Sequence, residues 1–168
     1  YTLAPGLALA IGALRILDNS TQVTLDASSS YGGVFTLGNF ARLDLNGQAF
    51  ALSGSMSALD GTVVGAGTIT VQGAADANGL LLTGGAGLRD LGTLTQDGVV
   101  NLGTGGADVA MLTIAPGAVY DLLGDVSINA YGSASINNAG MLEKLGASGT
   151  SIIRGSFASS GTIQVDMG

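Results

Sequence analysis

The chain has 168 residues, of which 46% are hydrophobic, 29 are glycine and only 10% are charged, where an ordinary soluble domain has about a quarter charged residues. The net charge is −7 and the five cations form no basic stripe, which argues against a nucleic-acid partner. Because His and Cys are both absent, disulfides and the usual zinc sites are excluded.

The chain opens on an apolar segment. Tyr1 to Leu14 carries no charge, but the basic region of a signal peptide is missing and Pro5-Gly6 interrupts the run, so we do not interpret it as a signal peptide. Tyr in place of an initiating Met indicates a processed or excised chain. No run reaches the ~18 strongly apolar residues that a spanning helix needs, so we expect no membrane insertion.

Short strands that repeat loosely follow this segment. A unit of glycine, threonine and an aliphatic residue recurs at Gly61-Thr62-Val63, Gly67-Thr68-Ile69-Thr70-Val71, Gly92-Thr93-Leu94 and Gly161-Thr162-Ile163-Gln164-Val165, with Gly140-Met141-Leu142 as a variant. Ile69 and Leu94 are twenty-five residues apart, and Leu142 and Ile163 are twenty-one residues apart. Such runs place alternate side chains on opposite faces of a strand.

Turn signals separate the strands. Their successive spacings are fourteen, eighteen, nineteen and again nineteen residues, at Asn46-Gly47, Asp60-Gly61, Asn78-Gly79, Asp97-Gly98 and Pro116-Gly117. A period near twenty residues is too short for a propeller blade of about 40 residues and fits one coil of a solenoid, in which each strand pairs with its equivalent one coil away. The sequence therefore predicts an all-β protein with one parallel β-helix of about eight coils over residues 1–168. A β-sandwich of short period-two strands is the alternative.

Alternation also predicts which side chains are inside. We expect the aliphatic residues of the strands to be buried, namely Ile69, Val71, Leu94, Leu112, Ile114, Ile128, Ile163 and Val165. The polar residues between them are expected to face outward, namely Thr70, Thr113, Ser127 and Gln164. Tyr31, Phe35, Phe40 and Phe50 hold half of the aromatic residues, which favours an internal aromatic stack or cap contact over a binding patch.

Several segments resemble the degenerate repeats of large bacterial surface proteins. These segments are residues 112–122, 136–144 and 159–165, which read LTIAPGAVYDL, INNAGMLEK and SSGTIQV. They are similar to repeats of autotransporter passengers and filamentous-haemagglutinin-like exoproteins. The resemblance implies that the β-helix is right-handed and that the protein is secreted to the extracellular space or cell surface. It also implies a role as stalk, fibre or adhesin.

The sequence contains few of the residue combinations that catalysis requires. His, the commonest base for a nucleophilic triad, is absent, and the carboxylate pairs Asp121 with Asp125 and Asp90 with Asp97 have no local cluster of aromatic residues or cations. We therefore expect no enzyme and no cofactor. A polysaccharide lyase or hydrolase is the remote alternative, and a cleft with two close carboxylates would indicate it.

A single calcium-like motif occurs at Gly103-Thr104-Gly105-Gly106-Ala107-Asp108-Val109. It matches half of the nonapeptide repeat that binds calcium between coils, and because such sites share ligands between successive copies, we interpret this isolated copy as a glycine-rich turn around Asp108. We expect no metal site.

The expected function is therefore structural, as an extracellular rod with adhesive faces. An adhesin module that contacts a glycan, ice or a host surface through ranks of outward Thr and Ser is the alternative, although only scattered cases such as Thr68-Ile69-Thr70 occur. Neither end shows a clear cap, so we expect a segment of a longer chain or a subunit that associates head to tail into filaments. The candidate assembly contact is Leu3, Leu7, Leu9, Ile11, Leu14 and Ile16.

Overall fold

The computed structural model describes residues 1–3 and 11–166, and it contains no helix within these ranges. Short strands form three sheets of eight, seven and eight strands, here called sheets A, C and B. Every strand pairing is parallel, as between β10 and both of its neighbours. The all-β parallel solenoid is therefore confirmed, and the β-sandwich, in which neighbouring strands run antiparallel, is excluded.

The three sheets run along the length of the molecule. Sheet A contains β1 (Thr2–Leu3), β3 (Gln22–Leu25), β6 (Arg42–Asp44), β9 (Thr62–Val64), β12 (Leu81–Thr83), β15 (Val100–Leu102), β18 (Ser127–Ala130) and β21 (Ile152–Arg154). Sheet C contains β4 (Ser29–Tyr31), β7 (Ala49–Leu52), β10 (Gly67–Val71), β13 (Ala86–Asp90), β16 (Met111–Ile114), β19 (Ser135–Asn138) and β22 (Ser156–Ser159). Sheet B contains β2 (Ala13–Ile16), β5 (Val34–Gly38), β8 (Met56–Leu59), β11 (Ala74–Asn78), β14 (Thr93–Gln96), β17 (Val119–Leu123), β20 (Met141–Leu145) and β23 (Thr162–Val165).

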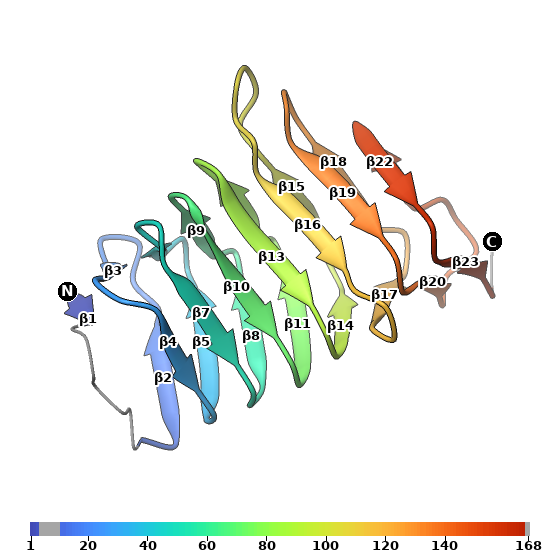
Figure 1. The fold of residues 1–168 in the computed structure, drawn as a ribbon. Helices are drawn as coiled ribbons and strands as arrows, with labels where there is room; N and C mark the ends of the chain where they lie inside the picture. The colour runs from blue at the N-terminus through green and yellow to red at the C-terminus, as the bar shows by residue number, and fades with distance from the viewer. Residues whose placement is uncertain (4–10, 167–168) are drawn as a thin grey trace.

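Each coil passes from sheet A to sheet C to sheet B, as β9, β10 and β11 do, and the molecule has about seven turns, close to the expected eight. Figure 1 shows the coils stacked into a rod with the two termini at opposite ends. The right-handed coil implied by the family resemblance stays a prediction.

The coils lengthen toward the C-terminal half. Thr68 pairs with Ala49, nineteen residues earlier, whereas Ile128 pairs with Val100, twenty-eight residues earlier. The longer coils carry their additional residues in corner loops, above all in residues 103–110 between β15 and β16, which project beyond the neighbouring corners (Figure 1). The insertion leaves the stacking of the strands intact because loops tolerate added length at little entropic cost.

Inward side chains form continuous ladders along the rod. In sheet C one ladder runs through Phe50, Ile69, Leu88, Leu112 and Ile136, and each of these is at most 1% exposed. The expected burial of Ile69, Val71, Leu94, Leu112, Ile114 and Ile128 is confirmed. Gln164 is exposed, and Thr70, Thr113 and Ser127 are partly exposed, so the predicted register is correct.

The expected burial of Ile163 and Val165 is wrong. Both residues continue inward ladders, because they pair with Leu142 and Lys144, but they are 54% and 62% exposed. They belong to the last described strand of sheet B, and no coil lies over them in the described part of the chain. Alternation predicts the direction of a side chain, whereas burial also requires a neighbouring coil.

The aromatic cluster forms an internal stack with one member outside. The rings of Phe35 and Phe50 meet edge to face with centroids 5.4 Å apart, and both are fully buried together with Tyr31. Phe40 has a positive φ of 62° in the turn after β5 and is 66% exposed. The favoured interpretation is confirmed for three of the four rings.

Candidate functional site

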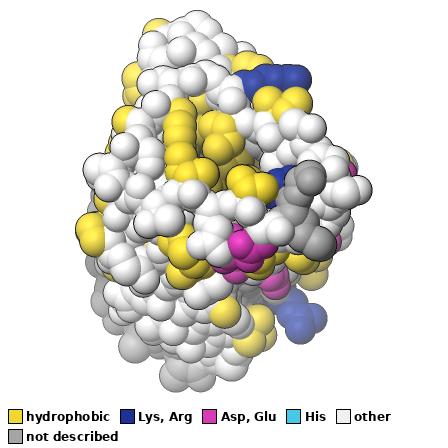
Figure 2. All heavy atoms as spheres, turned by 90° about the vertical axis from the view of Figure 1, so that its right-hand side faces the viewer, with side chains coloured by type: hydrophobic (Ala, Val, Ile, Leu, Met, Phe, Trp, Pro, Cys, Tyr) yellow, Lys and Arg dark blue, Asp and Glu magenta, His cyan; other side chains and the backbone are white. Residues whose placement is uncertain are grey.

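The C-terminal end of the rod exposes the interior of the solenoid. β21, β22 and β23 each lie at the edge of their sheet, with one neighbouring strand in the described part of the chain. Figure 2 shows hydrophobic side chains gathered near the centre of this end. A hollow of about 170 Å³ is lined by Leu122, Leu142, Lys144, Ser151, Ile153, Ile163, Gln164 and Val165. The end is thus an apolar surface bordered by parallel strand edges, which can act as a template for a further strand.

A buried lysine lies below this surface. Lys144 is 6% exposed, and its ammonium donates to the carbonyl oxygens of Gly146 and Ala147 at 3.2 and 2.9 Å. The ammonium also lies 3.3 Å from Oδ1 of Asp125. The aliphatic stem can therefore pack inside while the charge is compensated at the corner. Asp125 is held in this ion pair, which leaves it poorly suited to act as the catalytic partner of Asp121.

Of the N-terminal residues expected to form an assembly contact, those that the structure describes lie on the first coil. Leu3 lies on β1, and Ile11 is 49% exposed. Leu14 on β2 is partly buried against the core. Ile16 is 2% exposed and pairs with Leu37, so it belongs to the core ladder. Leu7 and Leu9 lie outside the described residues.

The carboxylate pair Asp90 and Asp97 is not brought together. Asp90 is fully buried at the corner before β14, whereas Asp97 is exposed at the corner after it, so the two lie at opposite ends of one strand. A pair that the sequence pattern did not reveal is closer, because Asp121 and Glu143 are register partners on the outer face of sheet B. The only signal for this pair in the sequence is that the two residues are one coil apart.

The surroundings of Asp121 and Glu143 do not resemble those of a glycosidase. The Gln164 amide donates to Oε1 of Glu143 at 2.9 Å and to Oδ1 of Asp166 at 2.7 Å. Partial burial raises the pKa of Asp121, and desolvation, a hydrogen bond with Asp166 and repulsion from Asp166 and Asp121 raise that of Glu143. Both carboxyl groups extend from one sheet face, whereas glycoside hydrolysis needs two that flank the scissile bond.

Asp108 organises the projecting loop. Its carboxylate accepts hydrogen bonds from the Thr83 hydroxyl at 2.5 Å, from the Thr104 amide at 3.1 Å and from the Gly85 amide at 3.4 Å. Partial burial opposes ionisation, but these donors outweigh it and lower the pKa of Asp108. The carboxylate thus ties the loop to the preceding coil, as expected for a glycine-rich turn.

Within residues 1–3 and 11–166, no group of three or more acidic, His or Cys side chains is placed to hold a metal ion. The same residues include no helix with the length and apolar character needed to cross a membrane. Comparison with protein-family models, curated proteins and solved structures finds no match for this chain.

Proposed function

We propose that this chain is a rigid rod in a secreted bacterial surface protein, where it serves as a stalk or fibre with adhesive faces. The observation that carries the proposal is the regular stack of about seven turns, in which three parallel sheets and their inward ladders continue along the described rod. The resemblance of residues 112–122, 136–144 and 159–165 to bacterial exoprotein repeats supports the extracellular setting.

The coil geometry suits a load-bearing or spacing element. Each coil pairs with its immediate neighbours, so the sheet hydrogen bonds run parallel to the rod axis from one coil to the next. About seven turns at ~4.8 Å give a rod of roughly 34 Å. Adding coils lengthens such a rod without changing its width, which is the property that a stalk or fibre requires.

The two ends are complementary in register. β2 forms one edge of sheet B and β23 forms the other. Leu14 begins the ladder that ends with Ile163, and Ile16 begins the ladder that ends with Val165, through the successive pairings of sheet B. A second copy added head to tail would therefore place Leu14 over Ile163 and Ile16 over Val165. Such heterologous contacts do not close, so they generate filaments.

Light scattering and electron microscopy over a concentration series test this assembly. We expect the mean mass to rise with concentration and the particles to lengthen at constant width. Globular aggregates of variable width would contradict a coil-on-coil contact. Monomers at every concentration would refute self-assembly of this chain and would leave the rod as a spacer within a larger protein.

A further inference from the structure

The outer face of sheet C differs in chemistry from that of sheet B. Along the middle of sheet B, the outward row is Arg15, Thr36, Ser57, Asp76, Thr95, Asp121, Glu143 and Gln164, with three carboxylates. The corresponding row of sheet C is Ser30, Ala51, Thr70, Arg89, Thr113, Asn137 and Ala158. In a chain of net charge −7, this row has no carboxylate, and its C-terminal end is neutral.

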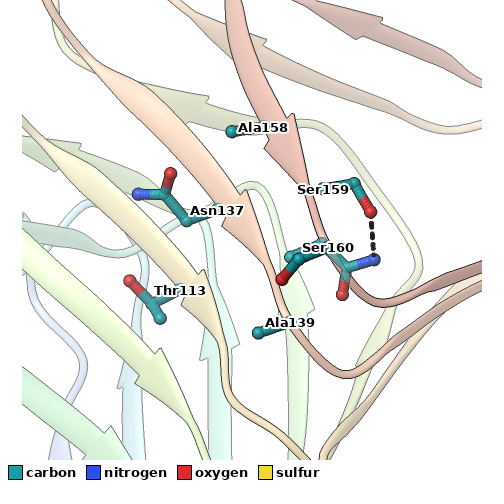
Figure 3. A pocket seen from close by; sticks show the side chains of 7 residues that line it. Thr113, Asn137, Ala139, Ala158, Ser159 and Ser160 are labelled. Atoms are coloured by element: carbon teal, nitrogen blue, oxygen red, sulfur yellow. Dashed lines mark hydrogen bonds between the residues drawn. The ribbon is translucent and has the colours of Figure 1, made fainter.

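A hollow of about 250 Å³ lies at this neutral end of the row. It forms where the outward residue shrinks from Asn137 on β19 to Ala158 on β22, and the corner residues Ala139, Ser159 and Ser160 border it. Figure 3 shows Thr113, Asn137 and Ala158 on successive strands, with Ser159 and Ser160 beside them.

The polar groups of the hollow are available to a ligand. The side chains of Thr113, Asn137 and Ser160 make no hydrogen bond to any described residue. Asn138, by contrast, is 2% exposed and holds the corner, because its amide donates to Ser159 Oγ at 3.1 Å and to the carbonyl oxygen of Thr162 at 3.0 Å. The hollow therefore combines a fixed floor with unpaired, uncharged donors and acceptors.

We propose that this hollow binds one sugar unit of an uncharged glycan chain that lies along the outer face of sheet C. Hydroxyl groups of a sugar can exchange hydrogen bonds with the Asn137 amide and with the Thr113 and Ser160 hydroxyls, while the Ala139 and Ala158 methyl groups can contact its C–H face. The volume is below the ~300–1,000 Å³ of pockets that enclose a drug-sized ligand, which fits a single ring of an extended chain. This adhesive site goes beyond the structural rod and does not depend on end-to-end assembly.

Charge decides between classes of glycan. The overall charge of −7 disfavours a polyanionic polysaccharide through long-range repulsion. A cationic ligand would find its carboxylates on sheet B, not in this row. An uncharged glycan is not repelled by the negative charge of the protein and needs no carboxylate for binding. It can form hydrogen bonds with the unpaired amide and hydroxyl groups, so a neutral glycan is the occupant that fits.

Titration of the intact chain with maltohexaose, cellohexaose and chitohexaose, followed by amide NMR shifts, tests the proposal, with hexagalacturonate as the anionic comparison. We expect one neutral oligosaccharide to shift the amides of residues 137–139 and 158–160, with a Kd on the order of 1 mM. Asn137→Ala should weaken this binding about tenfold because it removes two or more hydrogen bonds. Thr70→Ala is the matched control, since Thr70 lies in the same row away from the hollow.

Three outcomes would overturn the proposal. One is that no neutral oligosaccharide shifts the amides of the hollow. Another is that only hexagalacturonate binds and that Arg89→Ala abolishes this binding, which would assign the face to anionic ligands. The third is that Asn137→Ala and Thr70→Ala weaken binding equally while far-ultraviolet dichroism shows both variants folded, which would place the contact elsewhere on the row.

Discussion

Asp90 and Asn138 hold the same corner position two coils apart, and each accepts a hydrogen bond from the backbone amide of the glycine two residues later. Oδ1 of Asp90 accepts from Gly92 at 3.0 Å, and Oδ1 of Asn138 accepts from Gly140 at 3.1 Å. The second oxygen of Asp90 is buried without a partner among the described residues, whereas the Asn138 amide nitrogen has two acceptors. At this corner only one side-chain oxygen receives a hydrogen bond from a backbone amide. The position therefore suits asparagine better than an ionised aspartate.

This difference predicts that the protein is more stable in mild acid than at neutral pH. Burial, assisted by repulsion from Asp121 and opposed by the Gly92 amide, raises the pKa of Asp90 from 3.8 to about 6. The unfolded chain then loses its proton at lower pH than the folded chain, so the contribution of Asp90 to stability falls as pH rises from 3.8 to about 6, by about 3 kcal/mol at most. Asp90→Asn should remove this dependence and be at least as stable as the parent at pH 8.

Asn138→Asp is the reciprocal variant. It would set a carboxylate against Ser159 Oγ and the carbonyl oxygen of Thr162, which the amide nitrogen now satisfies. We expect a new loss of stability as pH rises from mild acid to neutral, measured by urea unfolding at several pH values. Equal pH dependence in the parent and in Asp90→Asn would show that Asp90 does not cause it.

A second prediction concerns glycines that stack at the corner between sheets C and B. A Cβ on Gly92 would lie 2.3 Å from the carbonyl oxygen of Gly73, which sits at the same corner one coil earlier. Gly92→Ala should therefore destabilise the protein by about 1–3 kcal/mol through overpacking. Gly12→Ala is the matched control, because a Cβ on Gly12 would meet no atom of the described residues within 4 Å. Similar unfolding midpoints for the two variants would contradict the close backbone stacking.

Much of this fold is predictable from local patterns. The alternation of apolar and polar residues indicates which way side chains point, and Gly or Asn indicates the corners between strands. The same patterns do not reveal which sheet a strand joins. Ile69 and Leu94 share the Gly-Thr-aliphatic unit, but Ile69 pairs with Leu88 in sheet C and Leu94 pairs with Ala75 in sheet B. Leu142 and Ile163, at a similar separation in sequence, do pair directly. Three similar strands per coil give equivalent local signals, so only pairing between coils distinguishes them.

The surface features depend on that pairing and were harder to predict. Asn137 and Ala158 become neighbours only through the register of β19 with β22, and Asp121 meets Glu143 only through that of β17 with β20. Variable corner lengths, such as residues 103–110, shift this register by several residues without a sequence signal that gives the exact shift. The unit at Asp108 was recognisable as a turn because its glycines and its acidic residue are local in sequence.

A third prediction is that Asp108 stabilises its loop as a carboxylate and without calcium. Asp108→Ala should cost about 1 kcal/mol and should accelerate amide exchange at Gly85 and Thr104, which donate to this side chain. Because the folded pKa is lowered, the contribution is present above the ordinary value of 3.8 and is lost as pH falls through the lower folded value. A chelator should leave the melting temperature unchanged. A drop of many degrees on removing calcium would instead reveal a metal bound to the folded protein.

The last prediction concerns the open C-terminal end. Changing both Ile163 and Val165 to Asp should block head-to-tail growth, because a covering coil would bury two charges without partners. The fold should tolerate the change, since both side chains are more than half exposed in the single chain.

Leu59→Asp is the control, because Leu59 is 47% exposed on the outside of sheet B, in the middle of the rod. In light scattering, the control should still grow with concentration while the double variant remains monomeric, and dichroism should show equal β content in both. Growth of the double variant at the parental rate would mean that the chains meet along their sides.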